Sequence, residues 1–243
     1  MTSVSTAESR AVAAPGVQTP GVDWFMAIAL LACAYAAIRA VFFTPVDAML
    51  GAVQKIFYLH VPAAIAGLYI GCGLLAICSI VYLWIKDERL DRLAESAAEV
   101  ALVFMSVVLT TGPIWGRSSW GTWWVWEPRL TLTLFLWFLV LSYLVLRGAI
   151  EQPEARARLS AVMGALAALL VPFIHLTVLL FRSQHPAPIV LTPSALTSSK
   201  LPPEMAATFG ISLLAFMLLF FAVLRLRYRW ATVRDARAAL EHG

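Results

Sequence analysis

Hydrophobic residues fall into six long stretches that short polar segments separate. Each stretch is close to the roughly 20 apolar residues that an α-helix needs to cross a bilayer. Charged residues or prolines bound each stretch. The pattern predicts an all-α, polytopic membrane protein, a bundle of six transmembrane helices. The predicted spans are 24–43, 61–85, 96–115, 129–147, 159–182 and 205–225.

The composition agrees with a membrane protein. Hydrophobic residues make up 61% of the chain and charged residues 13%, whereas soluble domains have about 45–50% and about 25%. There is too little polar surface for a soluble globule. The net charge of +4 is typical of loop orientation in a membrane protein, so we expect no nucleic-acid partner.

The two ends of the chain are more polar than the spans. Residues 1–22 are rich in Ala, Ser, Thr and Pro and lack an apolar core, so we expect a flexible tail and not a cleavable signal peptide. Residues 23–228 then form one membrane domain. Residues 229–243 are expected as a second tail.

The basic residues orient the bundle. Twelve of the 18 Lys and Arg lie on the side of the termini and six on the other side. The positive-inside rule makes both termini cytoplasmic. The connections 44–60, 116–128 and 183–204 then face outward.

Tryptophan is concentrated in one outward connection. Single tryptophans at span ends are typical of an aromatic belt at the membrane surface, which remains the alternative. Five in one loop fit better with a shelf for a large, flat, apolar ligand. The cluster consists of Trp115, Trp120, Trp123, Trp124 and Trp126.

Three polar or helix-starting residues follow the tryptophans. Pro128 suits the first position of a helix, and a carboxylate just before it meets the positive end of the helix dipole. Glu127 can therefore be purely structural. Arg129 can pair with Glu127 or meet an acidic group of a ligand.

Two histidines flank the tryptophan cluster. His60 precedes Val61-Pro62, and the residue before a proline avoids the helical region, so we expect a bend and a helix start at Val61. His185 lies just beyond the fifth span. Both are expected at the outer rim, where neutral imidazoles suit haem iron.

A third histidine lies inside the fifth span. His175 is expected roughly 10 Å below the outer rim. An ionisable residue in a span is a functional candidate, although a carbonyl freed by nearby Pro172 offers a plain hydrogen-bond partner. His242 lies in the C-terminal tail, and we assign it no role.

The sequence also lacks several motifs. It contains neither C-x-x-C nor C-x-x-C-H, so we expect no thiol pair and no covalent haem attachment. Cys33, Cys72 and Cys78 lie in spans and are expected to pack as small apolar residues. No Walker A sequence is present, so another subunit would supply any nucleotide hydrolysis.

Two segments resemble a known family. Trp120-Gly-Thr-Trp-Trp-Val-Trp-Glu-Pro-Arg-Leu-Thr131 resembles the tryptophan-rich signature of the haem-handling membrane proteins of cytochrome c maturation. His60-Val-Pro-Ala-Ala64 resembles the segment that holds their first histidine. The short chain with six spans resembles the haem exporter protein C branch, over about residues 24–225. The family motif ends in aspartate where this chain has Glu127, which keeps the charge and reaches one methylene further.

The resemblance implies a site for non-covalent, transiently bound haem b. His60 and His185 would hold the iron, with His175 as the rival of His185. Trp120, Trp123, Trp124 and Trp126 would form the shelf under the porphyrin. The candidates for contact with the haem propionates are the outward cations Lys55, Arg117, Arg129 and Arg182.

The resemblance also implies a function. The chain would present haem to a periplasmic haem chaperone at the outer face of a bacterial inner membrane, as a carrier and not an enzyme. Its partners would be an ATPase subunit, a second membrane subunit and a small membrane protein. Two alternatives stay open: a haem-exporting permease subunit of an ABC-type transporter, and an electron-transfer cytochrome b.

Overall fold

The computed structural model describes residues 22–181, 183–185 and 201–242. In this part of the chain six helices are long and apolar enough to cross a membrane, which confirms the predicted number of spans. The predicted N-terminal tail, apart from Val22, lies outside the described residues, as does most of the connection 183–204. The elements are α1 (Trp24–Phe42), the 3-10 helix η1 (Ala52–Ile56), α2 (Phe57–Ala64), the π-helix η2 (Ile65–Gly71), α3 (Cys72–Ile85), α4 (Glu88–Trp120), α5 (Pro128–Ala149), α6 (Pro153–Leu180) and α8 (Pro203–His242).

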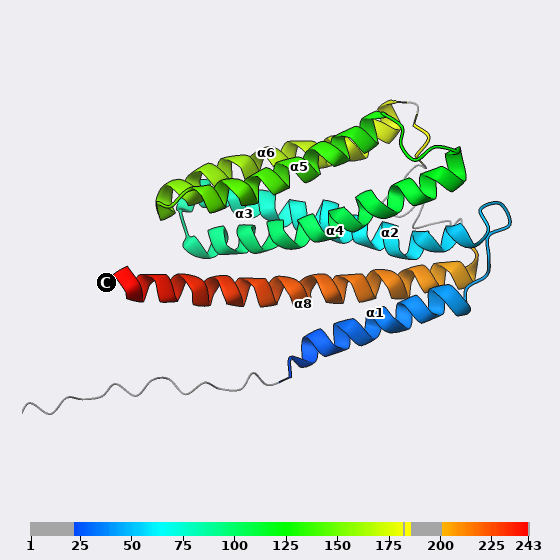
Figure 1. Ribbon diagram of the computed structural model, residues 1–243, viewed down its shortest axis with the longest axis horizontal. Helices are drawn as coiled ribbons and strands as arrows, with labels where there is room; N and C mark the ends of the chain where they lie inside the picture. The colour runs from blue at the N-terminus through cyan, green and yellow to red at the C-terminus, as the bar shows by residue number, and fades with distance from the viewer. Residues whose placement is uncertain (1–21, 182, 186–200, 243) are drawn as a thin grey trace, which may run out of the picture.

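Helix α4 lies at the centre of the bundle. It packs against α2, η2, α3, α5 and α8, while α6 packs against α3 and α5, and α1 packs mainly against α8 (Figure 1). Small residues allow close packing: a Cβ on Gly71 would lie 2.7 Å from the Cβ of Ala101 on α4. Many large apolar side chains of α1, such as Trp24 and Leu31, remain exposed, as expected for a surface that faces lipid.

The second span begins earlier than predicted. α2 starts at Phe57 and contains Pro62, and α2, η2 and α3 follow one another without a break, so the expected helix start at Val61 is wrong. Pro62 has no backbone N–H to bond to the Tyr58 carbonyl, but packed transmembrane helices tolerate such a loss. His60 therefore lies on a helix and is buried, with 9% of its surface exposed.

The third span is longer than predicted at both ends. The Asp87 side chain caps α4 by accepting a hydrogen bond from the Arg89 N–H at 2.8 Å, and Gly121, with φ of 75°, ends it in the left-handed region. Trp115 and Trp120 therefore stand on a helix and not in a loop. Pro113 also lies inside α4.

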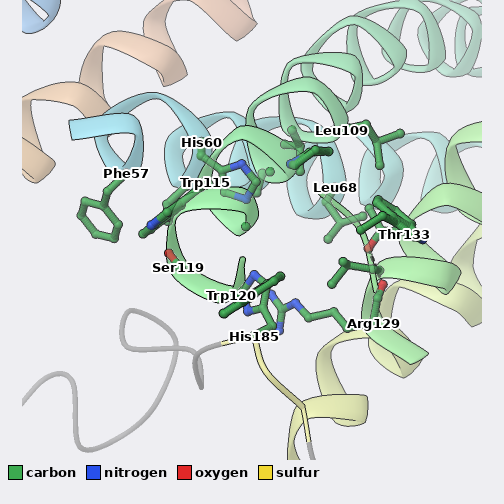
Figure 2. A pocket seen from close by; sticks show the side chains of 18 of the residues that line it. Phe57, His60, Leu68, Leu109, Trp115, Ser119, Trp120, Arg129, Thr133 and His185 are labelled. Carbon is green, nitrogen blue, oxygen red and sulfur yellow. Dashed lines mark hydrogen bonds between the residues drawn. The ribbon is translucent and has the colours of Figure 1, made fainter. Parts of the chain in front are cut away.

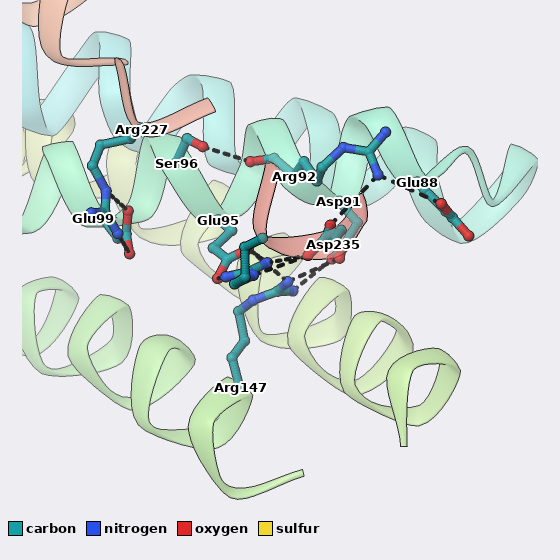
Figure 3. Close-up of polar contacts among 10 residues, drawn as sticks. Glu88, Asp91, Arg92, Glu95, Ser96, Glu99, Arg147, Arg227 and Asp235 are labelled. Atoms are coloured by element: carbon teal, nitrogen blue, oxygen red, sulfur yellow. Dashed lines mark hydrogen bonds and ion pairs between the residues drawn. The ribbon is translucent and has the colours of Figure 1, made fainter. Parts of the chain in front are cut away.

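Ion pairs explain why the polar start of α4 is helical. Arg147 of α5 lies 2.6 Å from Asp91 and 3.1 Å from Glu95 (Figure 3). Arg234 of α8 lies 2.7 Å from Glu95. Arg227 of α8 pairs with Glu99. These contacts join three helices at one end of the bundle, which we call the ion-pair end.

Helix α8 continues through the predicted C-terminal tail, since residues 229–242 are helical. With 40 residues at about 1.5 Å each, α8 is roughly twice as long as a bilayer core is thick. The start of α1 and the end of α8 point toward the same end of the bundle, as an even number of spans requires (Figure 1).

Candidate functional site

A cavity of about 340 Å³ lies at the end of the bundle away from the ion pairs. This volume falls within the range of small-molecule sites, about 300–1,000 Å³. Its walls come from Leu50, from α2 and η2, from the C-terminal part of α4 and the connection to α5, from the start of α5 and from the segment that follows α6 (Figure 2). Its polar and aromatic lining residues are Phe57, His60, Tyr69, Trp115, Ser119, Trp120, Trp123, Trp124, Arg129, Thr133 and His185.

His60 faces the cavity from α2. Its Nδ1 lies 2.9 Å from the hydroxyl oxygen of Thr111 on α4. Its ring meets Trp115 edge-on, with centroids 5.8 Å apart. Gly112 leaves room for the ring, because a Cβ there would lie 3.3 Å from His60 Cε1. The imidazole is thus held on two sides by α4.

His185 lines the same cavity, and Glu127 holds the segment that carries it. The Glu127 carboxylate accepts hydrogen bonds from the Ser183 hydroxyl and from the Gln184 N–H, each at 2.9 Å. The Ser183 oxygen in turn accepts a hydrogen bond from the His185 N–H at 3.0 Å. The structure therefore brings together two histidines from distant parts of the sequence, and Glu127 anchors the segment that carries the second.

The tryptophans divide into two groups. Trp115, Trp120, Trp123 and Trp124 line the cavity. Trp126 is not part of the lining, and its side chain is 77% exposed. It meets Trp124 edge-on, with ring centroids 5.8 Å apart. The indole surface of the cavity thus includes four of the five tryptophans of the predicted cluster, and Trp126 lies outside the lining.

Among the four candidate cations, Arg129 is the one placed to contact a ligand in the cavity. It lines the cavity and interacts with the Tyr69 hydroxyl, and its Nη1 is buried without a hydrogen-bond partner among the described residues. Lys55 Nζ instead donates to the Val41 carbonyl at 2.5 Å, and Arg117 donates to the Gly121 carbonyl. Arg182 lies outside the described residues.

His175 lies outside the cavity. It lines a separate apolar hollow with Tyr69, Pro172 and others. Its Nδ1 lies 3.2 Å from the Tyr69 hydroxyl, so its hydrogen-bond partner among the described residues is this tyrosine. Tyr69 lines both the hollow and the cavity, and therefore separates His175 from His60 and His185.

The donors in the cavity fit haem better than a bare metal ion. Within the described part of the chain, no three His, Cys, Asp or Glu side chains are grouped to hold an ion. Iron in a porphyrin already has four nitrogen ligands, so the two imidazoles that line the cavity would be enough to hold it. The apolar walls suit the ring, and the unpaired Arg129 nitrogen suits a carboxylate.

Sequence reasoning missed Tyr69, Thr111, Gly112 and Ser183. Only Thr111 gave a signal, since adjacent threonines within a span are unusual polar residues. The contacts of the others depend on how helices pack, which one sequence does not reveal.

Comparison with known proteins gives a consistent answer. The family model described as "Heme exporter protein C" (CcmC) matches residues 8–242. The chain is 35% identical to Heme exporter protein C of Paracoccus denitrificans over 226 residues, which cover 90% of this chain and 89% of that protein. The Rhodobacter capsulatus protein of the same name is 38% identical over 149 residues, or 60% of this chain and 61% of that protein. The Escherichia coli K12 protein is 31% identical over 77% of this chain and 74% of its own length.

Proposed function

The chain belongs to the haem exporter protein C family, and from this membership and the cavity we propose that it binds haem and hands it to a periplasmic haem chaperone during maturation of c-type cytochromes. One observation carries the proposal. His60 and His185, far apart in the sequence, line one cavity together with four tryptophans and a half-buried arginine, Arg129.

Each part of the cavity matches a part of the ligand. Haem is apolar in its ring and acidic at its two propionates. The indoles would bury the ring, and at about 25 cal/mol per Å² this supplies several kcal/mol. His60 and His185 would hold the iron. When haem is bound, the iron would accept electron pairs from these imidazoles. Arg129 Nη1 would pair with a propionate through a charge-assisted hydrogen bond.

The same arrangement suits transfer. The sequence has no C-x-x-C-H motif, so haem would be held without a thioether bond and could leave. Trp123 and Trp126 remain 59% and 77% exposed beside the cavity, where a soluble partner can reach them. The excess of basic residues at the ion-pair end would face the cytoplasm, so the cavity would face the periplasm across the inner membrane.

Other subunits would complete the machinery. With no Walker A motif in this chain, an ATPase subunit would hydrolyse nucleotide, beside a second membrane subunit and a small membrane protein. A permease role is favoured less, because the described polar lining gathers at one end of the bundle. An electron-transfer cytochrome b is also favoured less, because His175 is bonded to Tyr69 and lies outside the cavity.

The test is haem binding by the purified protein in detergent. Iron protoporphyrin IX is titrated into the unchanged protein and into His60→Ala, His185→Ala and His175→Ala, and the Soret band is followed. We expect the first two variants to lose the axial-ligand spectrum and His175→Ala to keep it. The loaded protein is then mixed with a purified periplasmic haem chaperone domain, and haem is expected to move to that domain.

Two results would contradict the proposal. If the unchanged protein binds no haem, the cavity is not a haem site. If His175→Ala loses the spectrum while His185→Ala keeps it, the second ligand is His175.

A further inference from the structure

The Thr111 hydroxyl has three polar neighbours. Its oxygen lies 2.6 Å from the Val107 carbonyl oxygen, 3.5 Å from the Val108 carbonyl oxygen and 2.9 Å from His60 Nδ1. A carbonyl oxygen only accepts hydrogen bonds, so the hydroxyl must donate at the 2.6 Å contact. Its single hydrogen is then used. Toward His60 the Thr111 oxygen can only accept, and His60 Nδ1 must carry the hydrogen.

Ser106, on the preceding part of α4, makes the same pair of hydrogen bonds, and there the donor and acceptor roles follow directly from the atom types. The Ser106 hydroxyl donates to the Leu102 carbonyl at 2.7 Å and accepts from Trp137 Nε1 at 2.9 Å. The indole nitrogen of tryptophan is a donor only. Helix α4 thus twice uses a hydroxyl that donates to its own helix and accepts an N–H from a neighbouring helix.

We propose that Thr111 fixes the tautomer and orientation of His60, so that the Nε2 lone pair is free for the iron of the bound haem. The proposal rests on the proposed function only in one respect, namely that haem iron is the metal that Nε2 would bind. Among the described residues no hydrogen bond is made to Nε2. The Trp115 ring and the space over Gly112 keep the imidazole in this pose. Thr111 touches no ligand itself and is a positioning residue.

Such a partner affects metal affinity. When the ring nitrogen that does not bind the metal donates its N–H to a partner, the other nitrogen becomes a stronger ligand for the metal. Loss of that partner typically lowers metal affinity about 10–100-fold. Without Thr111 the imidazole could also adopt the other tautomer, in which Nε2 carries the hydrogen and cannot bind iron.

The test compares three variants that leave the shape of α4 nearly unchanged. Thr111→Val replaces the hydroxyl with a methyl group, Thr111→Ser keeps the hydroxyl, and Thr110→Val is the matched control, because Thr110 bonds only within α4. We expect the haem Kd to rise about 10–100-fold in Thr111→Val and the reduction potential of bound haem to shift. Thr111→Ser should restore both, and Thr110→Val should change neither.

A second measurement needs no haem. ¹⁵N-histidine NMR of the haem-free protein is expected to show the His60 hydrogen on Nδ1, with the signal assigned by its loss in His60→Ala. In Thr111→Val this signal should give way to a mixture of tautomers.

The outcomes separate this inference from the proposed function. A His60 hydrogen on Nε2 in the unchanged protein overturns the role of Thr111, even if Thr111→Val does not fold. An unchanged Kd and potential in a folded Thr111→Val overturn it as well. If instead His60→Ala binds haem with an unchanged spectrum, His60 is not the iron ligand, and the proposed function fails at that residue.

Discussion

The carboxylate of Glu127, at the start of α5, accepts a hydrogen bond from the hydroxyl of Ser183, beyond the end of α6, at 2.9 Å. This contact joins the tryptophan segment to the segment that carries His185. Glu127 makes no side-chain hydrogen bond that caps its own helix. Its carboxylate therefore holds two distant segments together, beyond the helix-start role that the sequence alone leaves open.

Replacing Glu127 should loosen the second histidine. Glu127→Gln keeps the size but removes the charge and replaces one carboxylate oxygen with an NH2 donor, so the bond to Gln184 is lost or the bond to Ser183 must reverse its direction. Hydrogen bonds to charged groups contribute about 1.5–3 kcal/mol, and the contact is partly exposed, so we expect haem binding about tenfold weaker. Haem binding by Glu127→Asp should be weaker too, because the shorter side chain cannot reach both the Ser183 hydroxyl and the Gln184 N–H. Haem titration and dissociation rates measure both.

Glu204→Gln is the control for this pair of variants, since Glu204 is an exposed carboxylate on the first turn of α8. It should leave haem binding unchanged. Equal affinity of Glu127→Asp and the unchanged protein would show that the reach of the side chain is unimportant.

Adding a methyl group at Gly112 should displace His60. The new Cβ would lie 3.3 Å from His60 Cε1, and overpacking of this kind typically costs about 1–3 kcal/mol. We expect Gly112→Ala to weaken haem binding about fivefold or more while the protein stays folded. Gly73→Ala is the matched control, because a Cβ at Gly73 meets no atom within 4 Å. Equal haem affinity in the two variants would argue against a close fit around His60.

Arg129 should recognise a propionate. Arg129→Gln is expected to weaken binding of iron protoporphyrin IX about tenfold or more, because a charge-assisted hydrogen bond is lost. It should have little effect on the porphyrin dimethyl ester, which has no carboxylates. Arg117→Gln, outside the cavity lining, serves as the control. An equal loss for both porphyrins would mean that Arg129 supports the cavity wall instead.

The ion pairs at the far end should govern stability and not binding. Arg147→Met would leave Asp91 and Glu95 with less compensation in a buried setting, since the Arg147 side chain is only 4% exposed. Breaking a buried pair costs about 3–5 kcal/mol, so the midpoint of thermal unfolding in detergent should fall clearly. Arg225→Gln, whose pair with Asp23 is exposed, should change it little. The haem spectrum of folded Arg147→Met should be unchanged.

The sequence predicted the features that depend on composition, and it did not predict the features that depend on contacts between helices. Six apolar stretches became six membrane-length helices, and the tryptophan cluster and flanking histidines marked the cavity. The polar start of α4 could not be predicted as helix, because its partners Arg147 and Arg234 come from other helices. Pro62 indicated a boundary by a local rule that packed helices override. Trp124 and Trp126 are neighbours with opposite surroundings, which a sequence pattern does not distinguish.

Pro113 interrupts the backbone hydrogen bonds of α4 beside the cavity. It has no backbone N–H, so the Leu109 carbonyl, next to the cavity, lacks its usual helical bond. The two turns beyond it carry Trp115 and Trp120, and they can tilt at that point without breaking further backbone bonds. The helical part of the indole wall is thus joined to the rest of α4 at its least hydrogen-bonded point, whereas ion pairs hold α4, α5 and α8 together at the opposite end of the bundle. A displacement of Trp115 and Trp120 would therefore break fewer backbone hydrogen bonds than a bend anywhere else along α4.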